Sequence, residues 1–157
     1  MRNAAQLILA VTLPLAVGGL SGFATASGVA SWYPTLAKPS FNPPAWVFGP
    51  TWTVLYILMG VALFLVWQQG LNTQGVRLAL FVFGVQLMLN ALWSIIFFRM
   101  QSPGWAFAEI SLLWIAIIAT LWAFWRVMPA AGWLLVPYLA WVSFAAVLNG
   151  SIWFLNR

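Results

Sequence analysis

Residues 76–98 read VRLALFVFGVQLMLNALWSIIFF, and the one charge of this stretch, Arg77, stands in its first turn. A bilayer core about 30 Å thick needs roughly 20 apolar residues in a helix, so the stretch predicts a membrane span. Four more stretches of this kind flank it. The five predicted spans cover residues 6–26, 45–67, 76–98, 104–127 and 133–155. We therefore expect an all-α membrane protein, a five-helix transmembrane bundle that forms a single domain over residues 1–157.

The connections between the predicted spans are short except for the first. The short ones cover residues 68–75, 99–103 and 128–132 and are rich in residues that end helices. Such links place neighbouring spans antiparallel. The long first connection carries Pro34, Pro39, Pro43 and Pro44. With four prolines in residues 27–44, we expect a loop rather than a regular helix there.

The composition excludes most catalytic chemistry. The chain is 64% hydrophobic and 4% charged, whereas soluble domains carry about 25% charged residues. It has no Cys and no His, which excludes disulfides, thiol nucleophiles and thiolate or imidazole metal sites. Its one acid, Glu109, cannot form a carboxylate pair or a carboxylate metal cage. We expect no metal site and no required cofactor, and nothing here activates a nucleophile or a base.

The six basic residues are isolated from one another. The chain carries a formal charge of +5 but has no basic stripe to follow a phosphate backbone, so we expect no nucleic-acid partner. Three basic residues fall on each side of the five-span topology. Side A holds Arg2, Arg77 and Arg126, and side B holds Lys38, Arg99 and Arg157. Equal numbers leave the orientation open under the positive-inside rule.

The first span has two interpretations. Arg2, an apolar run and Ala24-Thr25-Ala26 imitate a signal peptide with its cleavage site. The small-residue pattern Gly18-x-x-x-Gly22 is instead typical of a helix packed inside a membrane bundle. We favour the packed helix.

The twelve tryptophans divide into two groups by depth. Seven lie at or near span ends, where Trp is common at membrane interfaces: Trp32, Trp46, Trp67, Trp105, Trp125, Trp133 and Trp153. Five lie deeper: Trp52, Trp93, Trp114, Trp122 and Trp141. With a rise of about 1.5 Å per residue, counting along the spans places Trp52, Trp93 and Trp141 between mid-bilayer and side B. They should lie beneath the first connection.

Three spans carry rows of polar, aromatic or small residues at a spacing of four. The rows are Trp52-Tyr56-Gly60, Gln86-Asn90-Ser94 and Trp141-Ala145-Asn149, with Trp93 beside the second and Tyr138 before the third. A buried amide in hydrocarbon needs a partner, so these rows should face inward. They are either hydrogen-bonding contacts between helices or the walls of a pocket for a flat apolar ligand. In the second case Gly60, Ala145 and Ala146 would leave room for it.

Glu109 is the one charge inside a predicted span, which makes it a candidate functional residue. We favour a structural role for it in the second turn of the fourth span. There it could reach water, complement the helix N-terminus or pair with Arg99. A proton-coupled transporter usually needs more ionisable groups than this chain has, so we disfavour that function.

Three motifs together resemble a known family. The first connection reads Trp32-Tyr33-x-x-Leu36-x-Lys38-Pro39-x-Phe41-Asn42-Pro43-Pro44, closely followed by Trp52 and Tyr56. The third span contains Asn90-x-x-Trp93, and the fifth Val136-Pro137-Tyr138-x-x-Trp141-x-x-Phe144-Ala145-x-x-Leu148-Asn149. From the first span to the last the chain resembles the tryptophan-rich sensory protein and translocator protein family, which includes the peripheral-type benzodiazepine receptor.

The resemblance implies a five-helix fold, commonly a homodimer, that binds porphyrins such as protoporphyrin IX, and haem, in a pocket capped by the first loop. With the rows above, the expected ligand-binding residues are Tyr33, Pro43, Pro44, Trp52, Tyr56, Asn90, Trp93, Tyr138, Trp141 and Ala145. We expect the ring to stack on Trp52 and Trp141, Asn90 to hydrogen-bond and propionates to reach water or Lys38. Small residues of the third span, such as Gly84, are candidates for the dimer face.

Several functions stay open at this point. The resemblance suggests sensing, transport or regulation of tetrapyrrole metabolism in a bacterial cell membrane, inner or outer. The alternatives are a catalyst of porphyrin degradation that uses Trp52 and Trp141, and a structural or partner-regulating membrane protein without a pocket ligand. Cholesterol binding is doubtful, because the L/V-x-Y-x-K/R pattern that ends helix five in animal members reads Leu148-Asn149-Gly150-Ser151-Ile152-Trp153 here, without a tyrosine.

Overall fold

The computed structural model describes residues 2–157 of the chain. Five long helices dominate the described residues, which contain no strand. They are α1 (Arg2–Ser27), α2 (Ala45–Trp67), α3 (Val76–Ser94), α4 (Pro103–Val127) and α5 (Pro129–Leu155). Each belongs to a helical segment that is long and apolar enough to cross a membrane. The predicted five-helix membrane bundle is therefore confirmed.

Helical structure extends beyond several of the predicted span boundaries. After α1 the chain continues through a π-helical turn, η1 (Gly28–Trp32), and a 3₁₀ turn, η2 (Tyr33–Thr35). The expected loop over residues 27–44 is thus free of helix only from residue 36 onward. Pro34 lies in the first turn of η2, where the fixed φ of proline suits the start of a helix. For the same reason α5 begins at Pro129 rather than at the predicted Trp133.

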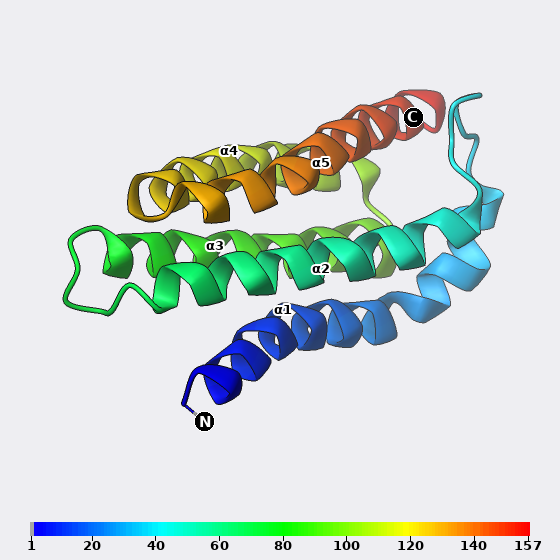
Figure 1. The fold of residues 1–157 in the computed structure, drawn as a ribbon. Coiled ribbons are helices and arrows are strands. Elements are labelled where there is room, and N and C mark those ends of the chain that lie inside the picture. The colour runs from blue at the N-terminus through cyan, green and yellow to red at the C-terminus, as the bar shows by residue number, and fades with distance from the viewer. Residues whose placement is uncertain (1) are drawn as a thin grey trace.

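The helices run alternately up and down (Figure 1). α1 packs on α2, α3 on α4, α4 on α5 and α2 on α5. The N-terminal end of α1 and the α2–α3 and α4–α5 turns lie at one end of the bundle, which is side A. The first connection, the α3–α4 turn and the C-terminus lie at the other, which is side B. A further π-helical turn, η3 (Ile95–Arg99), continues α3 toward side B.

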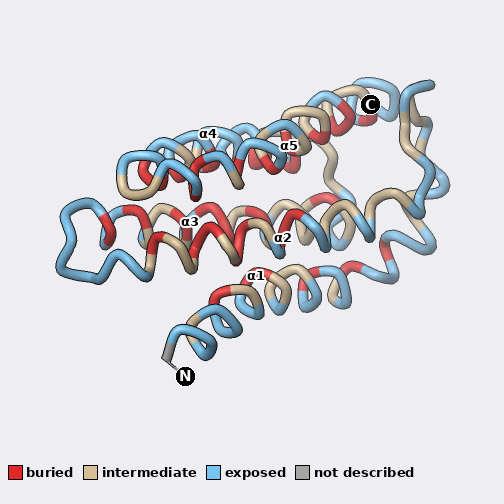
Figure 2. The backbone as a smooth tube through the Cα atoms, in the orientation of Figure 1, coloured by how far each residue is buried: buried red, intermediate tan, exposed pale blue. Residues whose placement is uncertain are grey.

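The buried core lies between α2, α3, α4 and α5, while α1 covers one side and remains largely exposed (Figure 2). Phe83 and Phe124 stack within this core, with ring centroids 5.6 Å apart and planes inclined by 14°. Met59, Ile117 and Leu135 are each at most 1% exposed. The core therefore ties the four helices together along the bundle and fixes the positions from which the side-B residues project.

Glycines let α1 approach α2 closely. A Cβ on Gly60 would meet the backbone of Ala10 and Val11, and one on Gly18 would meet the ring of Tyr56. Gly60 therefore makes room for α1, and the expectation that it makes room for a ligand is wrong. Of the predicted small-residue pair in α1, Gly18 packs against α2, whereas a Cβ on Gly22 would meet open space.

Candidate ligand-binding site

An aromatic cavity lies near side B, beneath the first connection. Its lining comes from η2, α2, α3, η3 and α5: Tyr33, Phe48, Trp52, Trp93, Phe97, Phe98, Trp141, Ala145, Leu148, Asn149 and Ile152. The cavity volume is about 20 Å³, which is enough for about one water molecule. The aromatic side chains therefore fill this region almost completely, and the structure shows a closed site.

Each of the three long helices that line the cavity carries a tryptophan in contact with other rings. Trp52 of α2 stacks on Tyr56 with centroids 5.6 Å apart. Trp141 of α5 meets Phe48 edge-on at 6.0 Å, and Trp93 of α3 lies 5.5 Å from Phe97. Such offset and edge-to-face pairs are favourable arrangements of aromatic quadrupoles. Three tryptophans from three helices thus face one small volume, as depth counting predicted.

A chain of buried hydrogen bonds runs directly behind Trp52. Tyr56 donates its hydroxyl proton to Asn90 Oδ1 at 2.7 Å, and Asn90 Nδ2 donates to the Tyr138 hydroxyl at 3.0 Å. Tyr138 then donates to Gln86 Oε1 at 2.9 Å. All four side chains are at most 8% exposed. These hydrogen bonds join α2, α3 and α5 in a region where no water can replace a missing partner. They also hold the two tyrosine rings against Trp52.

A second polar link lies at the side-B end of the cavity. Trp93 Nε1 donates to Asn149 Oδ1 at 3.0 Å, and Asn149 Nδ2 donates to the carbonyl of Pro103 at 2.8 Å. Asn149 is only 2% exposed. One amide therefore fixes the indole of α3 and the first turn of α4 against α5.

The indole N–H of Trp141 differs from the other polar groups of the site. Trp141 Nε1 is buried and has no acceptor within residues 2–157. Buried donors in folded proteins are paired in the great majority of cases. Trp141 thus lines the cavity and carries a buried donor whose hydrogen-bonding capacity the described residues leave unused.

The ten predicted ligand-binding residues separate into three groups. Five line the cavity: Tyr33, Trp52, Trp93, Trp141 and Ala145. Three form the buried hydrogen-bond chain: Tyr56, Asn90 and Tyr138. Two belong to the connection above and are not among the lining residues: Pro43 and Pro44. Asn90 already uses both its oxygen and its nitrogen, so in this closed state it supports the cavity wall rather than facing the cavity.

Six lining residues were not predicted as ligand-binding. They are Phe48, Phe97, Phe98, Leu148, Asn149 and Ile152. Leu148, Asn149 and Ile152 follow Ala145 at three, four and seven positions, a helical face that the pattern does contain. Phe97 and Phe98 lie in η3, where a π-helical turn shifts the helical phase. An α-helical count cannot place them.

The remaining deep tryptophans lie on the outside of the bundle. Trp114 and Trp122 are 39% and 58% exposed. Trp114 Nε1 donates to the Ser143 hydroxyl at 2.8 Å, and the Trp122 ring lies 5.2 Å from the guanidinium carbon of Arg126. These two indoles therefore face the surroundings of the bundle and take no part in the site.

Glu109 does not occupy the environment predicted for it. It is 6% exposed, and both carboxyl oxygens are buried without a hydrogen-bond partner among residues 2–157. Arg99, the expected partner, is exposed. Glu109 shares the buried face of α4 with Ala106, Ile110 and Leu113, so its helical position turns it inward. The expected contact with water or with Arg99 is wrong.

A cation stands at the rim of the site. Lys38 Nζ lies 4.8 Å from the centroid of the Tyr33 ring and donates to the carbonyls of Pro34 at 3.3 Å and Leu36 at 3.1 Å. Tyr33 itself donates to Asn42 Oδ1 at 2.8 Å. The ammonium group is therefore held over a ring that lines the cavity.

Five apolar helices, three of which line a closed aromatic cavity, define a multi-pass integral membrane protein whose candidate site lies within the bundle. A sequence model of the TspO/MBR family matches residues 10–154, and the chain belongs to this family. It is 49% identical to the tryptophan-rich protein TspO of Chlorobaculum tepidum over 150 residues, 96% of this chain and 95% of that protein.

Further relatives extend the comparison across distant organisms. The chain is 41% identical to the tryptophan-rich protein TspO of Archaeoglobus fulgidus over 155 residues, 98% of this chain and 99% of that one. It is 43% identical to the human translocator protein over 123 residues, 78% of this chain and 73% of that protein. The predicted resemblance to the sensory and translocator family is therefore confirmed.

Proposed function

We propose that the protein binds a porphyrin-type tetrapyrrole, such as protoporphyrin IX or haem, in the aromatic cavity and thereby acts in sensing, transport or regulation of tetrapyrrole metabolism. The observation that carries the proposal is the convergence of Trp52, Trp93 and Trp141 on one volume. Large flat indole faces favour stacking with an apolar ring. The unpaired N–H of Trp141 adds a donor for a polar edge of the ligand.

Binding requires the site to open. Ligand pockets usually have volumes of about 300–1,000 Å³, whereas this cavity has about 20 Å³. The helix walls are tied together by the buried hydrogen bonds of Asn90 and Asn149. The connection above the cavity is free of helix from residue 36 to residue 44, so we propose that displacement of this segment opens the site.

The polar groups available to a tetrapyrrole set its expected binding mode. Lys38 stands beside Tyr33 at the rim, where its ammonium group can pair with a propionate. The chain has no His and no Cys, so a haem iron would receive no strong axial ligand from it. Metal-free protoporphyrin IX should consequently bind about as well as haem.

The proposal is tested by titrating the detergent-purified protein with protoporphyrin IX in the dark, with quenching of Trp fluorescence as the signal. Saturable quenching is expected for the wild type. It should weaken in Trp141→Ala, which removes a wall, and in Asn90→Ala, which removes the support of Tyr56 and Tyr138. Quenching that rises linearly, or that ignores both substitutions, would mean that porphyrin only dissolves in the micelle.

A catalytic function is the second candidate, because the indole of Trp141 lines the cavity with its N–H unpaired. If Trp52 and Trp141 take part in porphyrin degradation, porphyrin absorbance should fall with turnover when the bound protein is illuminated. Trp141→Phe should then abolish the loss and preserve binding. Stable absorbance under illumination would leave binding without catalysis. Absence of saturable binding would favour the structural, partner-regulating alternative.

A second copy of the chain is the proposed protein partner, beside the surrounding lipid. On α3, Phe81 and Met88 are 68% and 74% exposed, and a Cβ on Gly84 between them would meet open space. This small-residue position allows a helix of another copy to approach closely. Gly84→Leu should shift a detergent-solubilised dimer toward monomer in light-scattering measurements, whereas Gly22→Leu on α1 should not.

A further inference from the structure

The helix-free part of the first connection borders the aromatic cavity through Tyr33, a lining residue whose ring lies 4.8 Å from Lys38 Nζ, and it has few hydrogen bonds to the bundle. We call residues 36–44 the lid. Most of its hydrogen bonds stay within the first connection: Tyr33 donates to Asn42, Asn42 Nδ2 donates to the carbonyl of Pro43, and the Asn42 backbone donates to that of Pro39. These bonds shape the lid but do not hold it against the helices opposite.

Asn156, at the end of α5, connects the lid to that helix by hydrogen bonds. The backbone N–H of Ala37 donates to Asn156 Oδ1 at 2.9 Å, and Asn156 Nδ2 donates back to the carbonyl of Ala37 at 2.9 Å. One side-chain amide thus pairs with both backbone groups of one lid residue, 119 positions away in the sequence. Among residues 2–157, these are the hydrogen bonds that join the lid to α5 or its end.

The end of α5 holds the Asn156 amide in place. Asn156 directly follows the helix, and its Nδ2 also donates to the carbonyl of Ile152 at 2.7 Å. Ile152 lines the aromatic cavity and is 1% exposed. The amide that binds the lid is therefore fixed to the same turn of helix that forms part of the cavity wall.

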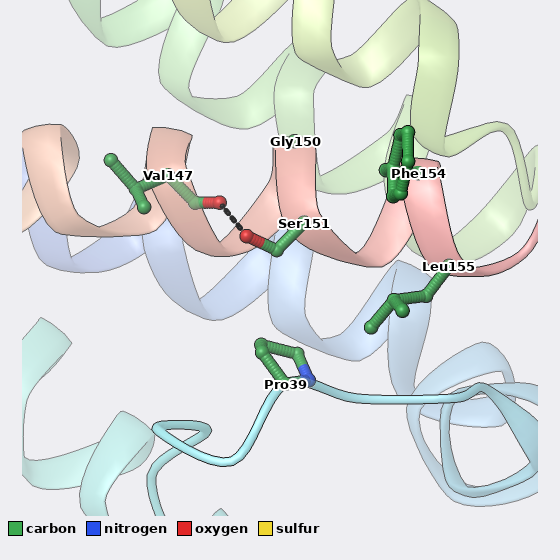
Figure 3. Close-up of a pocket in the computed structure, with 6 residues that line it drawn as sticks. All are labelled: Pro39, Val147, Gly150, Ser151, Phe154 and Leu155. Atoms are coloured by element: carbon green, nitrogen blue, oxygen red, sulfur yellow. Dashed lines mark hydrogen bonds between the residues drawn. The ribbon is translucent and has the colours of Figure 1, made fainter.

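Around Pro39 the lid stands apart from α5 (Figure 3). Between Ala37 and Phe41, whose ring meets Phe144 at 6.3 Å, an open groove of about 540 Å³ separates Pro39 from the helix. The α5 side of the groove includes Gly150 and Ser151, and Ser151 directs its hydroxyl to the carbonyl of Val147 within the helix. The lid is thus attached at separate points and is not packed along its length.

We propose that Asn156 is a latch: its paired hydrogen bonds with Ala37 keep the lid closed over the aromatic cavity, and their release sets the rate at which a flat ligand enters and leaves. The part about ligand exchange rests on the proposed function, whereas the part about closure does not. Both bonds lie at the exposed surface, where a pair of neutral hydrogen bonds changes an equilibrium by about tenfold. A contact of that size can hold a lid and still release it.

The closure is tested first without any ligand. The chain has no cysteine, so Ala145→Cys places a single thiol at the cavity wall, where residue 145 is 7% exposed. Its reaction with a small membrane-permeant thiol reagent reports how often the lid opens. Adding Asn156→Ala should raise the labelling rate about tenfold. Adding Asn72→Ala, which removes an asparagine from the α2–α3 turn, should leave the rate unchanged.

A second variant separates the latch from a simple helix cap. Ala37→Pro removes the N–H that donates to Asn156 and leaves the bond from Asn156 to Ile152 intact. Leu36 already has the extended backbone that a following proline requires, with φ −73° and ψ 143°. A latch predicts faster labelling with Ala37→Pro as well, by about threefold for one bond. Unchanged labelling in both variants would overturn the proposal and leave Asn156 as the cap of α5.

The exchange of ligand is tested by stopped-flow mixing with protoporphyrin IX in the dark. Asn156→Ala should raise the association and dissociation rate constants together, each about tenfold, and keep Kd within about threefold. If the wild type gives no saturable signal, the proposed function fails while the labelling result stands. If the wild type binds and Asn156→Ala changes neither rate constant, the latch does not control ligand exchange.

Discussion

The buried hydrogen-bond chain predicts unequal costs for two substitutions that remove one oxygen atom each. Tyr56→Phe deletes one hydrogen bond, the donation to Asn90 Oδ1 at 2.7 Å. Tyr138→Phe deletes two, because the Tyr138 hydroxyl accepts from Asn90 at 3.0 Å and donates to Gln86 at 2.9 Å. Both substitutions keep the ring, so the aromatic contacts with Trp52 are preserved.

The expected magnitudes follow from the number of bonds. A hydrogen bond contributes about 0.5–1.5 kcal/mol net, with an average of about 0.6 kcal/mol between membrane helices. We expect Tyr56→Phe to lower the free energy of unfolding by about 1 kcal/mol. Tyr138→Phe should lower it by about 2 kcal/mol, since it leaves both Asn90 Nδ2 and Gln86 Oε1 short of a partner in a buried position.

The assay is reversible unfolding in mixed micelles of increasing denaturing-detergent content, followed by helical circular dichroism. Phe83→Leu is a useful comparison, because it alters core packing on the side-A half without touching the hydrogen-bond chain. The double variant Tyr56→Phe/Tyr138→Phe should cost less than the sum of the single variants, since both hydroxyls share Asn90. An equal loss in the free energy of unfolding for the two single variants, or a larger loss for Tyr56→Phe, would refute this description of the buried hydrogen bonds.

Three further predictions concern other parts of the molecule. Glu109→Leu should raise the free energy of unfolding by about 1–3 kcal/mol, because it removes a buried carboxyl group without a partner; Glu109→Gln keeps an unpartnered polar group and should not. Gly60→Ala should destabilise the protein by more than 1 kcal/mol in the same unfolding assay, because its Cβ would meet the α1 backbone, whereas Gly22→Ala should be nearly neutral. Haem and metal-free protoporphyrin IX should bind within about threefold of each other, since the chain has neither His nor Cys; a strong preference for haem with a low-spin iron spectrum would contradict this.

The spans and the location of the site could be predicted because they depend on local patterns. Apolar length identifies each helix, and short turns fix the alternation of direction. Depth counting then places Trp52, Trp93 and Trp141 near side B, where the structure brings them together. Pro34 was misinterpreted because proline usually ends a helix, whereas here it occupies a first turn that tolerates it.

The same patterns could not predict which inward-facing residues line the cavity and which contact another helix. An inward-facing amide has the same spacing whether it faces a ligand or another helix, and Asn90 proves to be held by Tyr56 and Tyr138. Gly60 likewise could make room for a ligand or for a helix, and it makes room for α1. The contact between Ala37 and Asn156 joins residues 119 positions apart, and the periodicity of a single sequence does not predict such a long-range pairing.

The central claim is that a flat tetrapyrrole lies against the three tryptophans of the cavity. It is tested most directly by two matched triple variants titrated with protoporphyrin IX in the dark. The site variant carries Trp→Phe at the cavity positions Trp52, Trp93 and Trp141. The surface variant carries Trp→Phe at Trp46, Trp105 and Trp133, which are 73%, 74% and 61% exposed.

Each variant loses three of the twelve tryptophans, so differences in quenching report position rather than number. We predict that the surface variant keeps the wild-type Kd and shows a larger quenched fraction at saturation, because the tryptophans nearest the ligand make up more of its emission. The site variant should lose most of the saturable quenching. Equal quenching of the two variants would place the porphyrin outside the cavity and contradict the account.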